Sequence, residues 1–353
     1  MLYNKFIIIS LRHTSLLQEE SEARFFMKKP EKISLANLPT PINSFNKINP
    51  NKIFSTLYIK RDDFTGMEMS GNKVRKLEFS LKEALDQKAD VFITCGGLQS
   101  NHCRATAAAA AALSKKCHLV LRGSHENTAE GNLFLDKMLD TAITFITAEE
   151  YKDNRMGIME NIKKDYADKG ITAYILPEGA SNGIGLFGYY NAYEEILLQE
   201  MQLGIVFDTI CIADGSGGTY AGLYTANEVY GKGKNIVGIN IYNADDNAKS
   251  KIVRIIDEAV DISGYNNPIN KDNIHILADY VGEGYAIASD EIREFIKDTA
   301  KNSGTIFDPV YTGKAFYGIS EEIKKGNPLF KGNVLFIHTG GLYGIFPQKD
   351  SFF

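Results

Sequence analysis

The chain has 353 residues, which exceeds one ordinary domain and predicts two domains or one large one. Hydrophobic residues make up 44% and charged residues 24%, as in ordinary globular proteins. The formal net charge is -5 and basic residues form no block, so nucleic acid and anionic membranes are poor candidates for partners. No apolar run approaches the roughly 20 residues that span a bilayer, so we expect no membrane partner.

Residues 1–26 precede the start of the predicted domain. The apolar stretch 4–11 is followed by acidic residues and by no small-residue cleavage site, so we expect no signal peptide. Because Met27 begins a segment typical of a domain start, residues 1–26 are an upstream extension or a mis-assigned start. The four cysteines are scattered without a CxxC pair, which indicates a reduced, cytoplasmic protein with neither a disulfide framework nor a metal site.

Short β-branched runs alternate with helix-like segments along the chain. The predicted strands are Leu57–Lys60, Val91–Cys95, His118–Leu121, Ile143–Ile146, Ala173–Leu176, Thr209–Ala213, Ile236–Ile241 and Val334–His338. The clearest helix-like segments are Asn72–Gln87, Arg104–Ser114, Ala129–Leu139, Met156–Lys169 and Thr219–Val229. This alternation predicts an α/β fold with mainly parallel strands and helices on both faces. Ligands bind outside the carboxyl ends of such strands, so we expect functional residues in the turns that follow them.

The first candidate residue is Lys73, which opens a predicted helix beside Arg75 and Lys76. A lysine that forms a Schiff base must lose its charge near neutral pH, which requires burial or a neighbouring cation. Taken alone, the segment is more often a solvated first turn of an amphipathic helix.

A second candidate is the turn from Gly96 to His102, which follows a strand and starts a helix. Ser100 and Asn101 are favoured helix caps, which is the commoner interpretation in isolation. The alternative is that this helix start binds a substrate carboxylate. His102 is either a general base or, more often in such positions, an ordinary hydrogen-bonding histidine.

Glycines follow the predicted strand Thr209–Ala213, in the turn Gly215 to Thr219 that leads into a helix. Glycines let backbone N–H groups converge at a helix N-terminus, so the turn suits a phosphate, although a flexible turn with a helix cap remains open. The turn lacks a Walker lysine and an acidic ribose ligand, which disfavours a nucleotide. Two further polar turns, Asp308–Lys314 and His338–Gly341, could complete a pocket.

Five ordered segments together carry a family resemblance: SGNKVRKLEF, GGLQSNHCRATAAAAAAL, GSGGTYAGL, DPVYTGKA and HTGG. They resemble the D-cysteine desulfhydrase and 1-aminocyclopropane-1-carboxylate deaminase family, which belongs to the fold-type II (tryptophan synthase β-like) enzymes that use pyridoxal 5'-phosphate (PLP). The resemblance covers roughly Ile33 to Phe346. It implies a large PLP-binding domain formed by residues 27–76 and 179–353, a small α/β domain at 77–178, and the cofactor in the cleft between them.

For the cofactor, the resemblance implies that Lys73 carries PLP as a Schiff base and that Asn101 hydrogen-bonds its phenolic oxygen. Thr339 would approach the pyridine nitrogen. The phosphate would be held by Gly215, Ser216, Gly217, Gly218 and Thr219.

For the substrate, the resemblance implies a small amino acid whose carboxylate is held by Ser100 and by the backbone N–H groups from Gln99 through Asn101 to His102. Lys73 would remove the α-proton, and Tyr311 or Tyr285 would assist at the leaving group. The family's cyclopropane deaminases carry glutamate after the tyrosine of DPVY, near the pyridine nitrogen. Here the residue is Thr312, which we expect to contact substrate and which, with the SNH sequence at 100–102, indicates a desulfhydrase.

The predicted reaction is therefore the conversion of D-cysteine to pyruvate, ammonia and hydrogen sulfide by a lyase. The alternatives are a cyclopropane-carboxylate deaminase, a lyase for another β-substituted amino acid such as cysteate, and a non-catalytic ligand-binding relative. Retention of Lys73, Ser100, Asn101 and Tyr311 disfavours the last, because a binding protein needs no Schiff-base lysine. The resemblance also implies a homodimer.

Overall fold

The computed structural model describes residues 26–45, 55–242 and 247–353, and their strands form two separate sheets. The larger sheet has the strand order β1 (Ile42–Ser44), β2 (Ser55–Lys60), β10 (Gly332–Ile337), β7 (Thr209–Asp214), β8 (Asn235–Asn240) and β9 (His275–Leu277). The smaller sheet has the order β5 (Ala142–Ile146), β4 (Lys116–Arg122), β3 (Val91–Gly97) and β6 (Ala173–Ile175). Within the described ranges every pairing is parallel except that of β1 with β2. The predicted α/β fold is confirmed.

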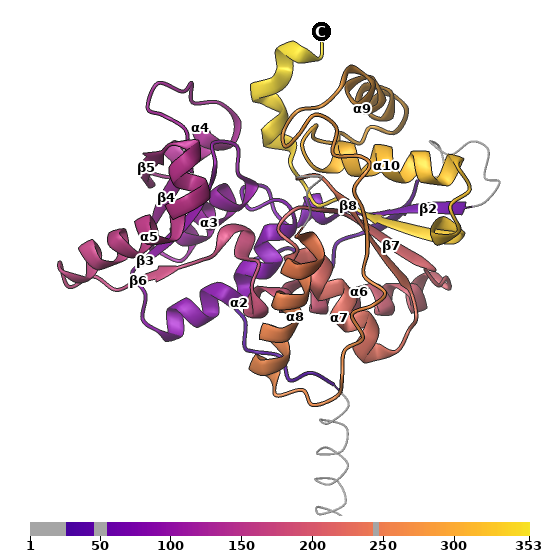
Figure 1. Ribbon diagram of the computed structural model, residues 1–353, viewed down its shortest axis with the longest axis horizontal. Coiled ribbons are helices and arrows are strands. Elements are labelled where there is room, and N and C mark those ends of the chain that lie inside the picture. The colour runs from indigo at the N-terminus through magenta and orange to yellow at the C-terminus, as the bar shows by residue number, and fades with distance from the viewer. Residues whose placement is uncertain (1–25, 46–54, 243–246) are drawn as a thin grey trace, which may run out of the picture.

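Helices cover both faces of each sheet, as Figure 1 shows. The helices are α2 (Asn72–Asp86), α3 (Asn101–Ala112), α4 (Gly131–Met138), α5 (Ala148–Ala167), α6 (Gly183–Leu203), α7 (Gly218–Tyr230), α8 (Ala248–Ser263), α9 (Asp290–Ser303) and α10 (Thr312–Lys324). Short 3-10 segments are η2 (Asp62–Phe64), η3 (Glu178–Ala180), η4 (Pro328–Phe330) and η5 (Leu342–Ser351). No helix in the described part of the chain has the length and apolar character that crossing a membrane requires.

Two apolar cores flank each sheet. On the larger sheet, α6, α7 and α8 pack on one face and α9 with α10 on the other. On the smaller sheet, α3 and α4 share one core, whereas α5 contributes Tyr151 and Met159 to the core on the opposite face. Each sheet is thus the middle of three layers, which is the arrangement that parallel strands need because both of their faces must be covered.

The predicted strands agree with β2 to β8 and β10 within a few residues, but two helices begin earlier than predicted. Helix α5 begins at Ala148 rather than Met156, because Thr147 and Glu150 form a capping box: the Thr147 hydroxyl accepts from the Glu150 N–H (3.1 Å), and the Thr147 N–H donates to the Glu150 carboxylate (2.8 Å). Helix α3 likewise begins earlier, at Asn101, because Ser100 caps it.

The strands of the smaller sheet all fall between residues 77 and 178, the range predicted for the small domain. The boundary at 76/77 lies inside the continuous helix α2, whose Leu77 and Leu81 join the smaller sheet's core while Phe79 joins that of the larger sheet. The domain boundaries stay a prediction. The prediction for residues 1–26 falls almost entirely outside the described residues.

Candidate active site

One cavity of about 290 Å³ brings together turns from both sheets. Among the predicted site residues, its walls include Lys73, Ser100, Asn101, His102, Gly215, Ser216, Gly217, Thr219, Tyr285, Tyr311 and Thr339. Three other predicted residues are not part of its walls, namely Gln99, Gly218 and Thr312. The cavity therefore collects groups that come from the carboxyl ends of strands in two sheets, where parallel α/β proteins bind ligands.

Lys73 stands in the first turn of α2, close to the turn after β10. Gly71 has a positive φ of 106°, and a Cβ there would lie 2.5 Å from the carbonyl oxygen of Thr339, so only glycine permits this approach. The Asn72 N–H donates to the same carbonyl (3.1 Å). Burial lowers the pKa of Lys73 from its ordinary value, although Glu178 and Asp214 oppose the shift. An amine with a lowered pKa is a nucleophile and a base, as a Schiff-base lysine must be.

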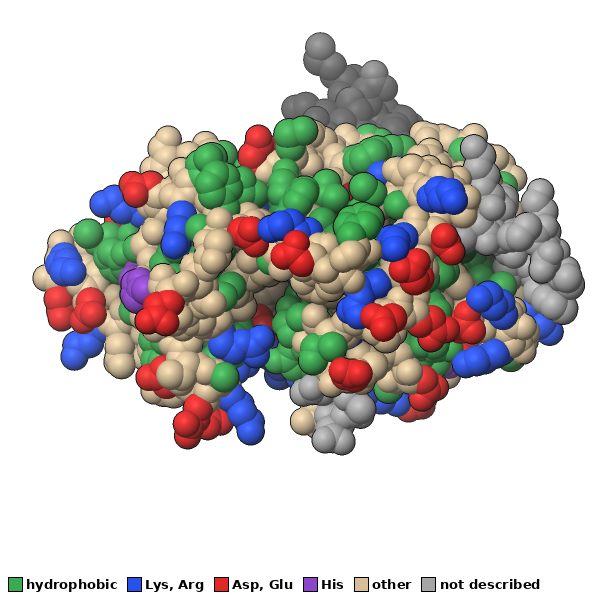
Figure 2. Space-filling model, turned by 90° about the horizontal axis from the view of Figure 1, so that it is seen from above, with side chains coloured by type: hydrophobic (Ala, Val, Ile, Leu, Met, Phe, Trp, Pro, Cys, Tyr) green, Lys and Arg blue, Asp and Glu red, His purple; other side chains and the backbone are tan. Residues whose placement is uncertain are grey.

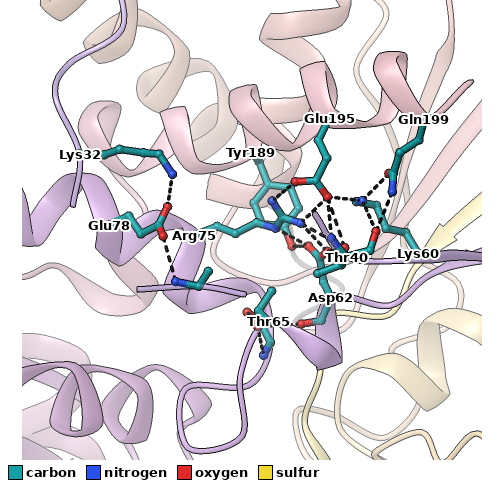
Figure 3. Close-up of polar contacts among 12 residues, drawn as sticks. Lys32, Thr40, Lys60, Asp62, Thr65, Arg75, Glu78, Tyr189, Glu195 and Gln199 are labelled. Carbon is teal, nitrogen blue, oxygen red and sulfur yellow. Dashed lines mark hydrogen bonds and ion pairs between the residues drawn. The ribbon is translucent and has the colours of Figure 1, made fainter. Parts of the chain in front are cut away.

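A buried ionic network involves Arg75 of α2 (Figure 3), and its residues are not among the walls of the cavity. Arg75 donates to both carboxylate oxygens of Asp62 (2.9 and 2.8 Å) and to both of Glu195 (3.0 and 3.1 Å). Glu195 also accepts from Lys60 (2.6 Å). Burial raises the pKa of Asp62, but the charges of Arg75 and Lys60 more than offset this, so the pKa lies below its ordinary value. Since Arg75 is two residues from Lys73, the network holds the helix that carries the amine.

The glycine turn after β7 leads directly into α7. Gly217 has a positive φ of 83°, and the N-terminus of α7 begins at Gly218. Ser216 Oγ lies 2.7 Å from Ser181 Oγ, and Asn72 Nδ2 donates to Thr219 Oγ1 (2.9 Å). A helix N-terminus with converging N–H groups and hydroxyls binds phosphate well.

Lys76 is a residue that the sequence analysis did not assign to the site. Its side chain is fully buried, its Nζ donates to Ser181 Oγ (3.1 Å), and it forms no ion pair with any residue that the structure describes. Burial and the nearby Lys73 place its pKa well below the ordinary value. If the neighbouring glycine turn binds the phosphate as predicted, a buried amine at this position would neutralise the phosphate, and the phosphate would favour the charged form of the amine. The spacing of Lys73 and Lys76, three residues apart on one helix face, is the signal that could have identified it.

Ser100 caps α3, and its Oγ accepts from the Cys103 N–H (3.2 Å), so its own proton remains available for donation. The His102 side chain is buried and its Nε2 lies 2.8 Å from Thr94 Oγ1. Burial, with Lys73 and Lys76, sets the His102 pKa well below its ordinary value. The contact with Thr94 agrees with an ordinary hydrogen-bonding histidine, and the role of His102 stays a prediction.

Two tyrosines, Tyr285 and Tyr311, face each other in the cavity with their hydroxyl groups in contact. Asp308 fixes Tyr311, because its carboxylate accepts from the N–H groups of Val310 and Tyr311 (both 2.9 Å). Burial raises the pKa of Tyr285 to about 12 and that of Tyr311 further, so both are protonated donors at neutral pH. The Thr312 hydroxyl donates to Asp308 (2.7 Å), away from the cavity.

A family model described as "pyridoxal-phosphate dependent enzyme" matches residues 33–340. The chain belongs to this family. Among relatives, a putative 1-aminocyclopropane-1-carboxylate deaminase of Thermotoga maritima is 41% identical, over 90% of this chain and 98% of its own. A protein of Arabidopsis thaliana named bifunctional D-cysteine desulfhydrase/1-aminocyclopropane-1-carboxylate deaminase, mitochondrial, is 38% identical over 97% of this chain and 90% of its own. The D-cysteine desulfhydrase of Salmonella typhi is 33% identical over 89% of this chain and 95% of its own.

Solved structures agree with the sequence matches. The crystal structure of a protein described as an ACC deaminase homologue superposes with a TM-score of 0.83 at 35% identity, covering 92% of this chain and 96% of that one. A hydrogen sulfide-producing enzyme of Fusobacterium nucleatum shares the fold, with a TM-score of 0.63 at 18% identity over 88% of this chain and 99% of that one.

The cavity fits the cofactor that defines the family. It contains a lysine of lowered pKa for the aldehyde and a glycine turn at a helix N-terminus for the phosphate. A Cβ on Gly218 would lie 2.7 Å from Ser181 Oγ, so the turn has room for backbone and ligand but not for a larger side chain. The enzyme thus uses pyridoxal phosphate, and the relatives described above are named D-cysteine desulfhydrase, 1-aminocyclopropane-1-carboxylate deaminase or both.

Proposed function

We propose that the enzyme is a D-cysteine desulfhydrase, which converts D-cysteine and water to pyruvate, ammonia and hydrogen sulfide. The observation that carries the proposal is the meeting of three groups in one cavity: the amine of Lys73, the capped helix start at Ser100, and the hydroxyl pair of Tyr285 and Tyr311. These are a base, a carboxylate site and proton donors, which are the groups that elimination of a β-substituent requires.

The chemistry that the cofactor would supply when bound is an electron sink for the pair left at Cα after loss of the α-proton. Lys73 removes that proton, since its lowered pKa leaves an amine free to accept it. Ser100 and the backbone N–H groups at the start of α3 hold the substrate carboxylate, which fixes the direction of the Cα–H bond. Tyr311 and Tyr285, protonated at neutral pH, donate to the departing sulfur.

The residue after Tyr311 favours sulfur elimination. Thr312 offers no carboxylate, and its hydroxyl is already bonded to Asp308 (2.7 Å). The group predicted near the pyridine nitrogen is then Thr339, whose hydroxyl stabilises a protonated ring less than a carboxylate does, so the electron sink is weaker. A good leaving group such as thiolate needs less assistance than the carbon–carbon bond of a cyclopropane.

The second candidate is 1-aminocyclopropane-1-carboxylate deamination. It is favoured by the Thermotoga relative, whose name is that of a putative deaminase, and by the Arabidopsis relative, whose name has both activities. The two candidates share the cofactor and the proposed carboxylate site but differ in their first step. D-cysteine has an α-proton that Lys73 can remove, whereas the Cα of the cyclopropane substrate carries no hydrogen.

Activity assays on the purified, PLP-loaded protein distinguish the two candidates. With D-cysteine we expect sulfide and pyruvate in equal amounts, and with the cyclopropane substrate we expect little 2-oxobutanoate. Lys73→Ala should abolish turnover and change the visible absorbance of the cofactor, whereas Lys82→Ala, on the solvent side of the same helix, should retain both. Sulfide release by Lys73→Ala at the wild-type rate would disprove the assignment of the base.

We further propose a homodimer. Large apolar side chains are exposed on η2 and the turn after it, on α4 and on η5, namely Phe64, Met67, Phe134, Met138, Leu342 and Phe346. The three segments adjoin, since Tyr343 donates to the Met67 carbonyl (3.2 Å) and Lys349 pairs with Glu130 (2.8 Å). Figure 2, which views the molecule from above, shows hydrophobic side chains in groups on this face. Such patches are typical of interfaces, and sedimentation equilibrium measures the oligomeric state directly.

We also propose a cytoplasmic location. The four cysteines are buried and free, which suits a reducing compartment. Fractionation of cells that express the tagged full chain tests this assignment.

A further inference from the structure

The start of α4 is hydrogen-bonded to the start of α3. Gln99 Nε2 donates to the Glu130 carbonyl (3.1 Å), and the Asn132 N–H donates to Gln99 Oε1 (2.9 Å). The Asn132 side chain, which is fully buried, donates through Nδ2 to the Gln99 carbonyl (2.9 Å) and to Asn101 Oδ1 (3.1 Å). Residues from about 30 positions further along the chain thus hold the segment that carries Ser100 and Asn101.

These contacts determine which way both amides point. The backbone carbonyl of Gln99 can only accept, so Asn132 must turn its NH₂ group toward it. The same NH₂ group reaches Asn101, so the Asn101 atom that faces α4 must be the oxygen. The NH₂ group of Asn101 therefore points away from α4, on a residue that lines the cavity.

We propose that Asn132 is a positioning residue that holds the Asn101 amide with its NH₂ group toward the cavity, where it donates to the phenolic oxygen of the cofactor. This inference rests on the proposed role of Asn101. An unrestrained amide can rotate by 180°, which would direct a carbonyl oxygen at the negatively charged phenolic oxygen and repel it. Asn132 removes that alternative because a rotated Asn101 would present an NH₂ group to another NH₂ group.

The test is a pH titration of the visible absorbance of the PLP-loaded protein. In the PLP-loaded protein the phenolic oxygen and the Lys73 nitrogen would share one proton. A hydrogen bond donated to the phenolic oxygen stabilises the form that has lost this proton, and so lowers the pKa that the titration measures. Loss of the bond in Asn132→Leu, which keeps the side-chain volume, should therefore raise the observed pKa by about one unit. Asn132→Ala should shift it in the same direction, as should Asn101→Ala.

A double variant separates positioning from general loosening. If Asn132 acts through Asn101, then Asn132→Leu in an Asn101→Ala background should add no further shift. The matched control is Asp136→Asn, one turn further along α4, which is also buried but forms no hydrogen bond with Asn101 within the described chain. It should leave the titration unchanged whatever it does to the melting temperature.

Each outcome has one meaning. If Asn132→Leu and Asn132→Ala titrate like the wild type while Asn101→Ala is shifted, the positioning role is wrong and the cofactor contact of Asn101 stands. Additive shifts in the double variant would also overturn the role. If Asn101→Ala itself leaves the titration unchanged, the contact between Asn101 and the cofactor is wrong, and the inference falls with it.

Discussion

Replacing Arg75 by methionine should severely destabilise the fold, because Arg75 is the centre of the buried network behind Lys73. Arg75 and Asp62 are almost completely buried, at 1% and 0% exposure. Arg75 donates to both oxygens of Asp62, to both of Glu195 and to Thr40 Oγ1 (3.2 Å). Methionine approximates the length of the side chain and retains none of these donors.

The expected magnitude follows from what the substitution leaves behind. Asp62 would keep the Tyr189 hydroxyl (2.5 Å) and the Thr40 hydroxyl (2.7 Å) but would lose its only ion-pair partner within the described residues. Removing one partner of a buried ion pair costs about 3–5 kcal/mol, because the other charge stays buried. For a protein whose folding free energy is roughly 5–15 kcal/mol, this is a large fraction of the total.

The loss should depend on pH in a direction that identifies its cause. In the wild type the pKa of Asp62 lies below its ordinary value, so its stabilising contribution is complete above the unfolded pKa and is lost as the pH falls through the folded pKa. Without Arg75, burial should dominate and raise the folded pKa above the unfolded one. The penalty in the variant should then be greatest at pH 7 and should shrink as the pH falls toward 5, where Asp62 takes up a proton.

Urea unfolding at pH 7 and pH 5, at one fixed PLP concentration, measures both effects. The control is Arg254→Met, because Arg254 is exposed and pairs with Glu258 one turn along α8 (2.5 Å). An exposed pair of this spacing contributes only about 0.3–0.5 kcal/mol. A loss for Arg75→Met of less than about 1 kcal/mol, or a loss that grows at pH 5, would refute the reasoning.

Three further predictions concern the cavity. Because the pKa of Lys73 is lowered from its ordinary value of 10.5, kcat should fall toward acidic pH with a midpoint below 10.5. A pH–rate profile whose acidic midpoint lies at or above 10.5 would exclude Lys73 as the base. Gly218→Ala should weaken PLP binding by about ten- to a hundredfold, since its Cβ would lie 2.7 Å from Ser181 Oγ. Absorbance titration with PLP measures the affinity. Wild-type affinity would mean that the turn accommodates the methyl group. Thr312→Val should lower the unfolding free energy by about 1–2 kcal/mol by removing two hydrogen bonds with Asp308, while the KM for D-cysteine stays unchanged. A raised KM would instead support direct contact of Thr312 with substrate.

Local patterns predicted most elements but not those that tertiary packing imposes. Helix α6 was not among the predicted helices, because Gly183, Gly185 and Gly188 in its first turns disfavour a helix. The structure requires at least one of them: a Cβ on Gly188 would lie 2.5 Å from the Arg75 carbonyl oxygen. Close contact between α2 and α6 therefore overrides helix propensity, and a single sequence gives no sign of that contact.

The residues of the candidate site likewise divide into those that local sequence predicted and those that it missed. The glycine turn, the capped helix start and Tyr311 follow strands or open helices, so sequence placed them on a common edge. Each contributes residues to the cavity walls, although Gly218 and Gln99 are not among them. Asn132 was missed because its role depends on packing of α4 against α3, which no local pattern encodes. Thr312 was predicted to contact substrate, yet its hydroxyl donates to Asp308, since a residue next to a cavity can turn either way. Gln99 was predicted to act through its backbone N–H, which the hydrogen bond from its side chain to Glu130 leaves a prediction.

Helix α2 connects the two halves of the molecule, because its residues belong to the cores of both sheets. Arg75 ties its first turns to Asp62 and Glu195 of the larger half, whereas Leu77 and Leu81 pack in the core of the smaller sheet. Lys73 is thus fixed relative to the larger sheet, while Ser100 lies at the end of a strand of the smaller one. In the proposed function one small amino acid contacts both Lys73 and Ser100, so the packing of the two sheets against α2 determines the distance that the substrate must span.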